Sequence, residues 1–169
     1  MKKIYFAGGC FWGVEHFFSL INGVKETTVG YANSNIPNPD YPTVKAHKTT
    51  AAETVEVIYD ESTISLEELV YLFFKIIDPT LIDKQGEDEG HQYRSGIYYL
   101  NDEDLGIINK VLIEIQKQYK DTIVTEVLKL ENFYMAEEYH QDYLVKNKDG
   151  YCHISPMYFK LAKEYKTKK

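Results

Sequence analysis

Apolar residues recur along the chain with two spacings, every second residue in some stretches and every third or fourth residue in others. Alternation is typical of a half-buried strand, and the wider spacing is typical of a helix with one buried face. The helical spacing is clearest after Ser65-Leu66-Glu67-Glu68, a capping box that marks the start of a helix. The patterns predict strands at 2–7, 24–31, 53–59, 96–100 and 122–130, and helices at 14–21, 66–77, 102–119 and 135–146.

The order of these elements predicts the fold class. Strand, helix, strand, strand, helix, strand is the split β-α-β (ferredoxin-like) arrangement, so we expect an α+β fold with a mixed sheet and helices packed on one or both of its faces. A chain of 169 residues suits one domain with a single core, so we assign residues 1–169 to one domain. Residues 147–169 have no clear period, and we expect a mostly irregular C-terminal segment there.

Charge and composition narrow the possible partners and compartments. The formal net charge of −7 argues against nucleic acid as a partner, because a phosphate backbone requires a basic surface. No apolar stretch is long enough to span a membrane or to act as a secretory signal, so we expect a cytoplasmic protein. In that compartment two cysteines without clustered histidines indicate redox or catalytic chemistry, with no metal site.

The first cysteine follows two glycines at a predicted strand-to-helix turn. Gly8 and Gly9 allow a tight turn, which places Cys10 at the start of the next helix. Unpaired N–H groups and a partial positive charge at that position favour an anion, so we expect the thiol of Cys10 to have a lowered pKa. Phe11 and Trp12 form an apolar wall beside it. The alternative is a buried core cysteine with aromatic packing.

Four ordered blocks of sequence hold the other candidate residues. They are Gly-Cys-Phe-Trp-Gly at 9–13, Asn-Pro-Asp-Tyr at 38–41 followed by Glu53, Gln-Gly-Glu-Asp-Glu-Gly-His-Gln-Tyr-Arg-Ser at 85–95, and Ala-Glu-Glu-Tyr-His-Gln at 136–141 followed by Cys152. Together they resemble the A-class peptide methionine sulfoxide reductases. Four blocks in order are more specific than any single short motif.

The resemblance implies a role for each matching position. Cys10 would be the nucleophile, Glu53 the acid that protonates the substrate oxygen, and Cys152 the resolving thiol in the C-terminal segment. The residues that would bind substrate are Phe11, Trp12, Tyr41, Asp88 and Tyr93. The sulfoxide methyl would contact the first two of these, and its oxygen would face Glu53 and the two phenols.

The resemblance also implies an activity and its partners. The chain would be a single catalytic domain that reduces methionine S-sulfoxide, free or in peptides and proteins, and so repairs oxidative damage. Cys10 would become a sulfenic acid, then a disulfide with Cys152, and thioredoxin or another dithiol would reduce that disulfide. No metal or organic cofactor is implied. We expect a monomer that binds neither nucleic acid nor membrane.

Two other classes of function remain open from the residues alone. A cysteine hydrolase would use Cys10 with His140 or His16 as its base, and it would turn over esters or peptides without a reductant. Read without the family, His140 is a structural hydrogen-bonding residue. A binding module for oxidised peptides would bind in a sulfoxide-dependent way but would release no reduced methionine.

Overall fold

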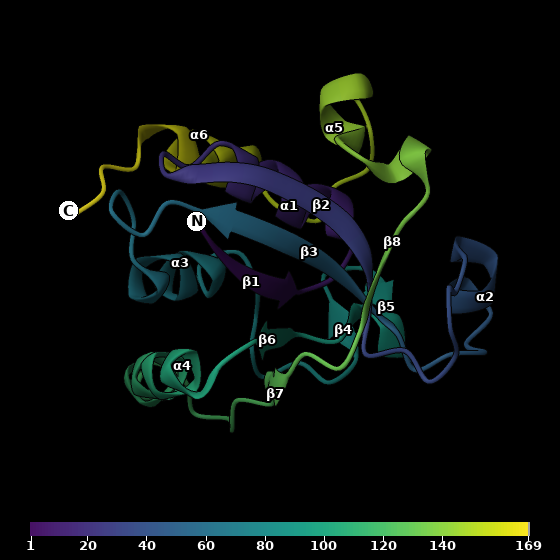
Figure 1. Cartoon of the computed structure of the whole chain (residues 1–169), viewed down its shortest axis with the longest axis horizontal. Helices are drawn as coiled ribbons and strands as arrows, with labels where there is room; N and C mark the ends of the chain where they lie inside the picture. The colour runs from purple at the N-terminus through teal and green to yellow at the C-terminus, as the bar shows by residue number, and fades with distance from the viewer. Residues whose placement is uncertain (169) are drawn as a thin grey trace.

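Six strands form one mixed sheet in the order β7-β6-β1-β3-β2-β8 (Figure 1). The computed structural model describes residues 1–168. Strand β1 lies in the middle and pairs antiparallel with β3 and β6, while β3 also pairs antiparallel with β2. Only β7 is parallel to its neighbour β6. The strands are β1 Lys2–Ala7, β2 Val24–Ala32, β3 Ala52–Tyr59, β6 Gly96–Tyr99, β7 Glu126–Lys129 and β8 Phe133–Met135. The expected α+β fold with a mixed sheet and a split β-α-β-β-α-β core is confirmed.

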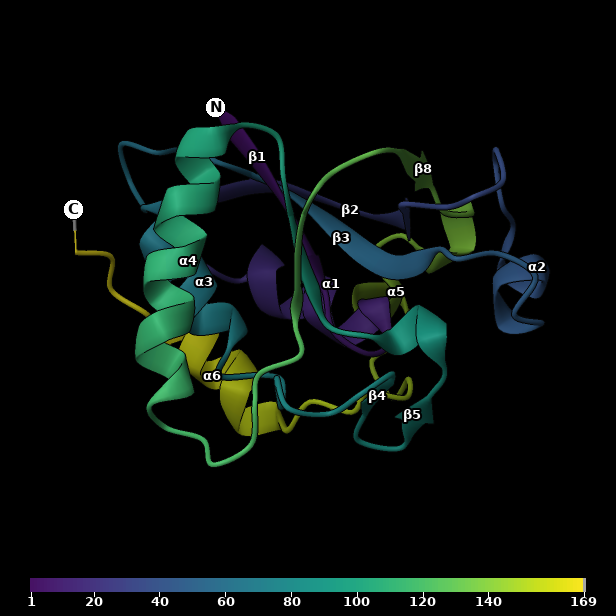
Figure 2. The same ribbon diagram turned by 90° about the horizontal axis from the view of Figure 1, so that it is seen from below.

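The helices pack against one face of this sheet and contribute to one core. They are α1 Phe11–Ser19, α3 Leu66–Phe73, α4 Asp102–Gln116 and α6 Pro156–Glu164, with the shorter α2 Tyr41–Lys45 and α5 Tyr143–Lys146. Figure 2 shows α1, α3 and α6 below β2 and β3. The predicted capping box is present, since the Ser65 side chain accepts from the Glu68 N–H and the Glu68 side chain accepts from the Ser65 N–H. These bonds satisfy N–H groups that the helix start leaves free.

Alternation along β1 separates the two faces of the sheet. Phe6 points to the helices, where its ring stacks on Phe18 of α1 and Phe73 of α3 at centroid distances of 4.5 and 4.8 Å. Tyr5 points to the opposite face and meets Phe133 at 5.2 Å. Each fully buried aromatic side chain contributes about 2–3 kcal/mol through the hydrophobic effect. Packing from both sides holds β1 rigidly, and β1 leads directly into the Gly-Gly-Cys turn.

The predicted helix at 135–146 is wrong. The structure has β8, a 3₁₀ turn at Glu138–His140 and then α5. The Gln141 side chain bonds to both backbone groups of Val29 at 2.9 Å and so takes the place of a neighbouring strand. Asp142 next to it has a left-handed backbone, with φ of 51°, which interrupts helical hydrogen bonding. Tertiary contacts therefore override the helical pattern.

Several other boundaries also differ from the prediction. Residues 80–95, where no strand or helix was predicted, contain a two-stranded ladder, β4 Lys84–Gln85 with β5 Asp88–Glu89, and a 3₁₀ turn at His91–Tyr93. The helix α2, Tyr41–Lys45, was likewise not predicted from the sequence pattern. The segment 147–169, expected to be mostly irregular, contains the helix α6; residue 169 lies outside the described residues. That the chain is one catalytic domain stays a prediction. Within residues 1–168, no helix is long and apolar enough to cross a membrane.

Candidate active site

A glycine turn places Cys10 at the start of α1. Strand β1 ends at Ala7, and Gly9 takes φ of +79°, a left-handed conformation that glycine adopts without strain. Its N–H donates to the carbonyl oxygen of Tyr93 at 3.2 Å, which ties the turn to the 85–95 loop. Cys10 itself is the N-cap residue of α1. The predicted strand-turn-helix arrangement is therefore present.

Two carboxyl groups from distant elements bind the first N–H groups of α1. The N–H of Cys10 donates to Asp88 Oδ2 at 3.3 Å, and the N–H of Phe11 donates to Glu53 Oε1 at 3.2 Å. A helix start leaves these donors without partners in the helix, so acceptors there are stabilising. Glu53 comes from β3 and Asp88 from β5, and the two bonds bring both of them to the cysteine.

The thiol of Cys10 does not have the lowered pKa that its place in the sequence suggests. Burial raises its pKa, and the nearby charges of Glu53 and Asp88 raise it further, while the N–H of Trp12 lowers it only in part. Cys10 is 7% exposed. Burial is the largest cause of the raised pKa of Cys10. The expectation of a lowered pKa for Cys10 was therefore wrong, because burial raises that pKa instead.

Glu53 is a buried carboxyl group that keeps its proton at neutral pH. Its side chain is enclosed, and the residue is only 2% exposed. Burial raises the pKa of Glu53 to about 8, against the opposing effect of the hydrogen bond from the Phe11 N–H. Glu53 therefore has the protonation state that a general acid needs.

Tyr41 and Tyr93 lie close to Glu53 and Cys10 and remain neutral donors. Burial raises the pKa of both phenols, and the charges of Glu53 and Cys10 add to the effect. The two phenols lie near each other as well. The predicted pocket residues thus come together from α2 and from the 85–95 loop.

Two contacts that were not predicted from the sequence fix the Trp12 side chain. Its indole N–H donates to His140 Nδ1 at 3.0 Å, and its ring stacks on Tyr143 with a centroid distance of 3.6 Å. His140 also contacts the rings of Phe11 and Tyr41, at 5.2 and 4.8 Å. His140 accepts a hydrogen bond at the centre of an aromatic cluster. This agrees with the expectation, made without the family resemblance, that it is a structural hydrogen-bonding residue.

Two glutamates, the buried Glu15 and the partly exposed Glu137, hold this aromatic cluster against the sheet. Glu137 accepts from the Tyr31 phenol at 2.8 Å and from the Tyr41 N–H at 2.9 Å. Glu15 on α1 accepts from the Asp142 N–H at 2.7 Å, just before Tyr143. Neither glutamate was singled out from the sequence. Glu137 lies within the fourth matching block, which was the available signal.

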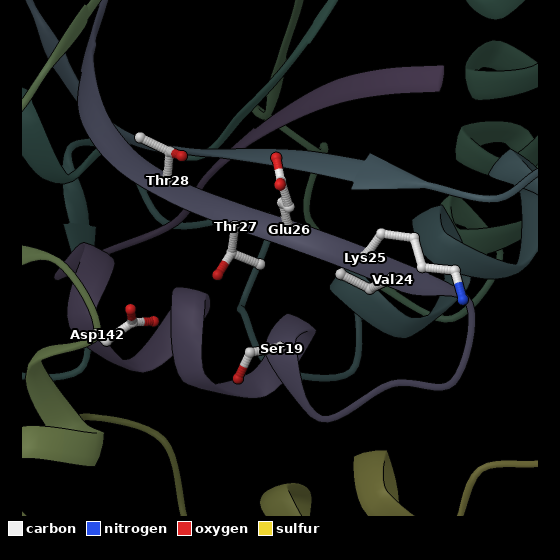
Figure 3. A pocket seen from close by; sticks show the side chains of 7 residues that line it. All are labelled: Ser19, Val24, Lys25, Glu26, Thr27, Thr28 and Asp142. Atoms are coloured by element: carbon white, nitrogen blue, oxygen red, sulfur yellow. The ribbon is translucent and has the colours of Figure 1, made fainter. Parts of the chain in front are cut away.

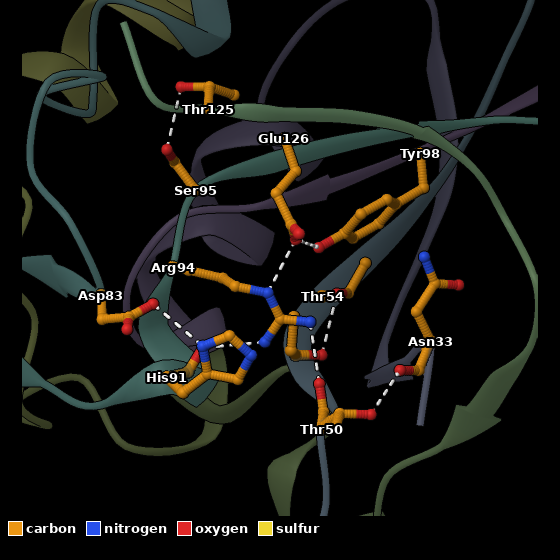
Figure 4. Close-up of polar contacts among 11 residues, drawn as sticks. Asn33, Thr50, Thr54, Asp83, His91, Arg94, Ser95, Tyr98, Thr125 and Glu126 are labelled. Carbon is orange, nitrogen blue, oxygen red and sulfur yellow. Dashed lines mark hydrogen bonds and ion pairs between the residues drawn. The ribbon is translucent and has the colours of Figure 1, made fainter. Parts of the chain in front are cut away.

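An ion pair anchors the loop that carries Asp88 and Tyr93. Arg94 donates from Nε to Glu126 at 2.7 Å and from its other nitrogens to the carbonyls of His91 and Thr50, each at 2.8 Å (Figure 4). Tyr98 donates to the same Glu126 oxygen at 2.8 Å. A mostly buried guanidinium with this many partners fixes its loop, because breaking any of the bonds leaves a charge poorly satisfied.

The second cysteine already lies next to the catalytic turn. A Cβ placed on Gly13 would be 2.7 Å from Cys152 Sγ, so the sulfur rests directly on the first turn of α1. Both cysteines are free thiols. Cys152 therefore requires no long swing to approach Cys10. Tyr151 and His153, its neighbours in the chain, both contact Asp88, and the sequence reading missed them.

A pocket of about 350 Å³ between α1 and β2 is separate from this site (Figure 3). It is lined by Ser19, by residues 24–28, which are polar except for Val24, and by Asp142, and neither cysteine lines it. Within residues 1–168, no group of three or more His, Cys, Asp or Glu is placed to hold a metal ion.

A thiol at a helix start, a protonated carboxyl group bound to the same turn and a second thiol one turn further along are the parts of a thiol-dependent oxidoreductase. Residues 2–169 match the family described as peptide methionine sulfoxide reductase. The chain belongs to this family.

Similar proteins support this assignment along the whole chain. A peptide methionine sulfoxide reductase MsrA from Mycoplasma genitalium is 56% identical over 154 residues, which cover 91% of this chain and 98% of the relative. The MsrA of Clostridium perfringens strain 13 is 58% identical, with the same coverage. The reduced form of Mxr1 from Saccharomyces cerevisiae superposes with a TM-score of 0.86 at 40% identity, covering 91% of each chain. Mxr1 has also been solved in complex with Trx2, with a TM-score of 0.61 at 30% identity; the match covers 84% of each chain.

The buried state of Glu53 predicts how stability depends on pH. The carboxyl has a pKa of about 8 in the folded protein and 4.5 as its reference value, so between these pH values folding takes up a proton. The stability contributed by this group is present below pH 4.5 and is lost as the pH rises through 8. Glu53→Gln cannot ionise, so it should gain stability relative to the unchanged protein by up to about 1.4 kcal/mol per pH unit across that window. Urea unfolding of both proteins at pH 5, 7 and 9 measures this, and a pH-independent difference would contradict it.

Proposed function

We propose that this protein reduces methionine S-sulfoxide, free or in peptides and proteins, to methionine, and so repairs oxidative damage. The observation that carries the proposal is the placement of Cys10 beside the protonated carboxyl of Glu53, with Cys152 one helical turn away. The family assignment and the names of the relatives support the substrate.

The first step transfers an oxygen atom from the substrate sulfur to Cys10. A sulfoxide oxygen leaves poorly unless it is protonated, and Glu53 supplies that proton while the phenols of Tyr41 and Tyr93 donate hydrogen bonds. The sulfur of Cys10 attacks the substrate sulfur, and its own proton passes to the newly formed carboxylate of Glu53. The substrate S–O bond breaks as the S–S bond to Cys10 forms, and the hydroxide that is released then attacks the Cys10 sulfur. That attack breaks the S–S bond, so methionine leaves and Cys10 becomes a sulfenic acid. The high pKa of the thiol is compatible with this order, because Glu53 becomes a base only after it has given up its proton.

The substrate side chain lies against aromatic surface in this proposal. Trp12 is partly exposed and is held flat by Tyr143, whereas Phe11 is buried behind it. Trp12 therefore forms the wall that the methyl group contacts, and Phe11 supports it. Asp88 binds the N–H of Cys10 and fixes the turn below the substrate.

The second step regenerates the thiol. Cys152 attacks the sulfenic sulfur of Cys10, water leaves, and a Cys10–Cys152 disulfide forms. Thioredoxin or another dithiol then reduces the disulfide by exchange; the solved complex of the similar Mxr1 with Trx2 supports thioredoxin as the reductant. These steps use only protein thiols, a carboxyl group and an external dithiol, so we propose that no metal or organic cofactor takes part.

We propose that the protein acts as a monomer in the cytoplasm. Its net charge of −7 fits a small-molecule or peptide substrate better than nucleic acid or an anionic membrane surface.

A coupled assay with NADPH, thioredoxin reductase and thioredoxin tests the activity on each sulfoxide epimer separately. Turnover is expected with the S epimer and not with the R epimer. Cys10→Ser should lose all turnover, because a hydroxyl cannot accept the oxygen atom. Turnover retained in Cys10→Ser would end the proposal, and ester or peptide hydrolysis without a reductant would favour a hydrolase.

Cys152→Ser should separate the two steps. This variant keeps Cys10 and Glu53, so it should release about one methionine per enzyme and then stop with thioredoxin as the only reductant. Quantifying methionine after mixing with excess substrate measures this amount. Continued turnover driven by thioredoxin would mean that Cys152 is not the resolving thiol.

Glu53→Gln should slow the first step about a hundredfold or more, the usual contribution of a general acid. The amide oxygen can still accept the Phe11 N–H, so the turn should be preserved. In the unchanged protein the rate of this step should fall as the pH rises through about 8, where Glu53 loses its proton. Single-turnover release of methionine against pH measures both effects. A rate within a few-fold of the unchanged protein would remove Glu53 from the acid role.

A further inference from the structure

Gly13 lies where the resolving segment, defined here as residues 151–154, meets α1. A Cβ on Gly13 would be 2.7 Å from Cys152 Sγ and 3.1 Å from Ile154 Cδ1, closer than packed atoms tolerate. Gly13 has an ordinary helical backbone, and glycine in a helix interior costs about 0.5–1 kcal/mol relative to alanine. The backbone of α1 therefore does not require a glycine here. The close approach of Cys152 is what requires a glycine at this position.

His153 provides a second contact of the resolving segment with the catalytic turn. Its side chain is only 4% exposed, and Nδ1 lies 3.5 Å from Asp88 Oδ2. A Cβ on Gly9 would be 2.8 Å from the His153 ring at Cε1. Neither ring nitrogen has a hydrogen bond of ordinary geometry among the described residues. A buried polar ring without full partners is costly, so a flexible segment would not place it there without compensating contacts.

The carboxyl group of Asp88 joins the resolving segment to Cys10. It accepts from the Cys10 N–H, it faces the His153 ring, and it lies near the phenol of Tyr151. Residues on both sides of Cys152 are thus tied to the group that also holds the nucleophile's backbone.

We propose that Gly13 and His153 are positioning residues that hold the resolving segment against the catalytic turn in the reduced enzyme, so that Cys152 is in place before Cys10 is oxidised. This inference rests on the proposed function. In the step concerned, the S–O bond of the Cys10 sulfenic acid breaks and a bond to Cys152 Sγ forms. The Cys152 sulfur is oxidised, the Cys10 sulfur is reduced, and the thiol proton leaves with the hydroxyl group as water. Since a disulfide needs Cα atoms within about 7 Å, docking one helical turn away leaves only a short movement.

Gly13→Ala is the sharpest test, because alanine should favour the helix while its methyl group displaces Cys152 and Ile154. The matched control is Gly106→Ala on α4, where an added Cβ would meet nothing within 4 Å. Reduced enzyme is mixed with one equivalent of free methionine S-sulfoxide and no reductant. Methionine release and loss of alkylatable thiols are followed separately in quenched samples.

We expect Gly13→Ala to release methionine within about twofold of the unchanged rate and to form the disulfide at least tenfold more slowly. Gly106→Ala should change neither rate. His153→Ala is the second variant, and it should show the same split without any change in α1. Unchanged disulfide formation in both variants would overturn the docking proposal, and so would an equal loss of methionine release and disulfide formation. Failure of the proposed function is distinguishable, because the unchanged enzyme would then release no methionine.

Discussion

The first turn of α1 depends on two acidic side chains that come from other parts of the chain. A helix start leaves its first N–H groups unpaired, and here Asp88 and Glu53 accept two of them, from Cys10 and Phe11. Glu53 lies on the central strand β3, and Asp88 lies in a loop fixed by the buried ion pair of Arg94 with Glu126. The hydrogen bonds that satisfy the start of α1 are therefore also the bonds that bring Asp88 and Glu53 to Cys10. The cysteine, the acid and the pocket loop reach their places only when β1, β3 and the loop are all folded.

This arrangement changes the usual electrostatics of a cysteine at a helix start. The positive end of α1 would favour a thiolate, but two carboxyl groups already accept from its N–H groups and Cys10 is only 7% exposed. Burial raises the pKa of Cys10 and of Glu53, so both groups are protonated together. In the proposed reaction, the carboxyl proton of Glu53 is the one given to the substrate oxygen. The thiol can lose its own proton to Glu53 once that proton has been donated.

The parts of the fold that were predicted correctly are those that local sequence specifies. The capping box at Ser65 and the alternation in β1 and β3 need no distant partner, and the split β-α-β-β-α-β order follows from them. The helix predicted at 135–146 does not form, because Gln141 and Asp142 are held by hydrogen bonds to Val29 and Glu15, which are more than 100 residues away in the sequence. The four sequence blocks indicated residues that the structure brings together around Cys10, but they gave no sign that burial would raise its pKa. No spacing in the sequence indicated where Cys152 and His153 would pack.

The glycines of the Gly-Gly-Cys-Phe-Trp-Gly stretch serve different purposes that only the structure separates. Gly9 has a left-handed backbone, so a turn requirement alone accounts for it. Gly13 is helical, so no turn requirement applies, and its lack of a side chain matters through what lies on it. The surface left bare by these two glycines is covered by His153 and Cys152 from the other end of the chain. A short motif thus provides both Cys10, the proposed nucleophile, and the bare surface against which Cys152 packs, although the two cysteines are 142 positions apart in the sequence.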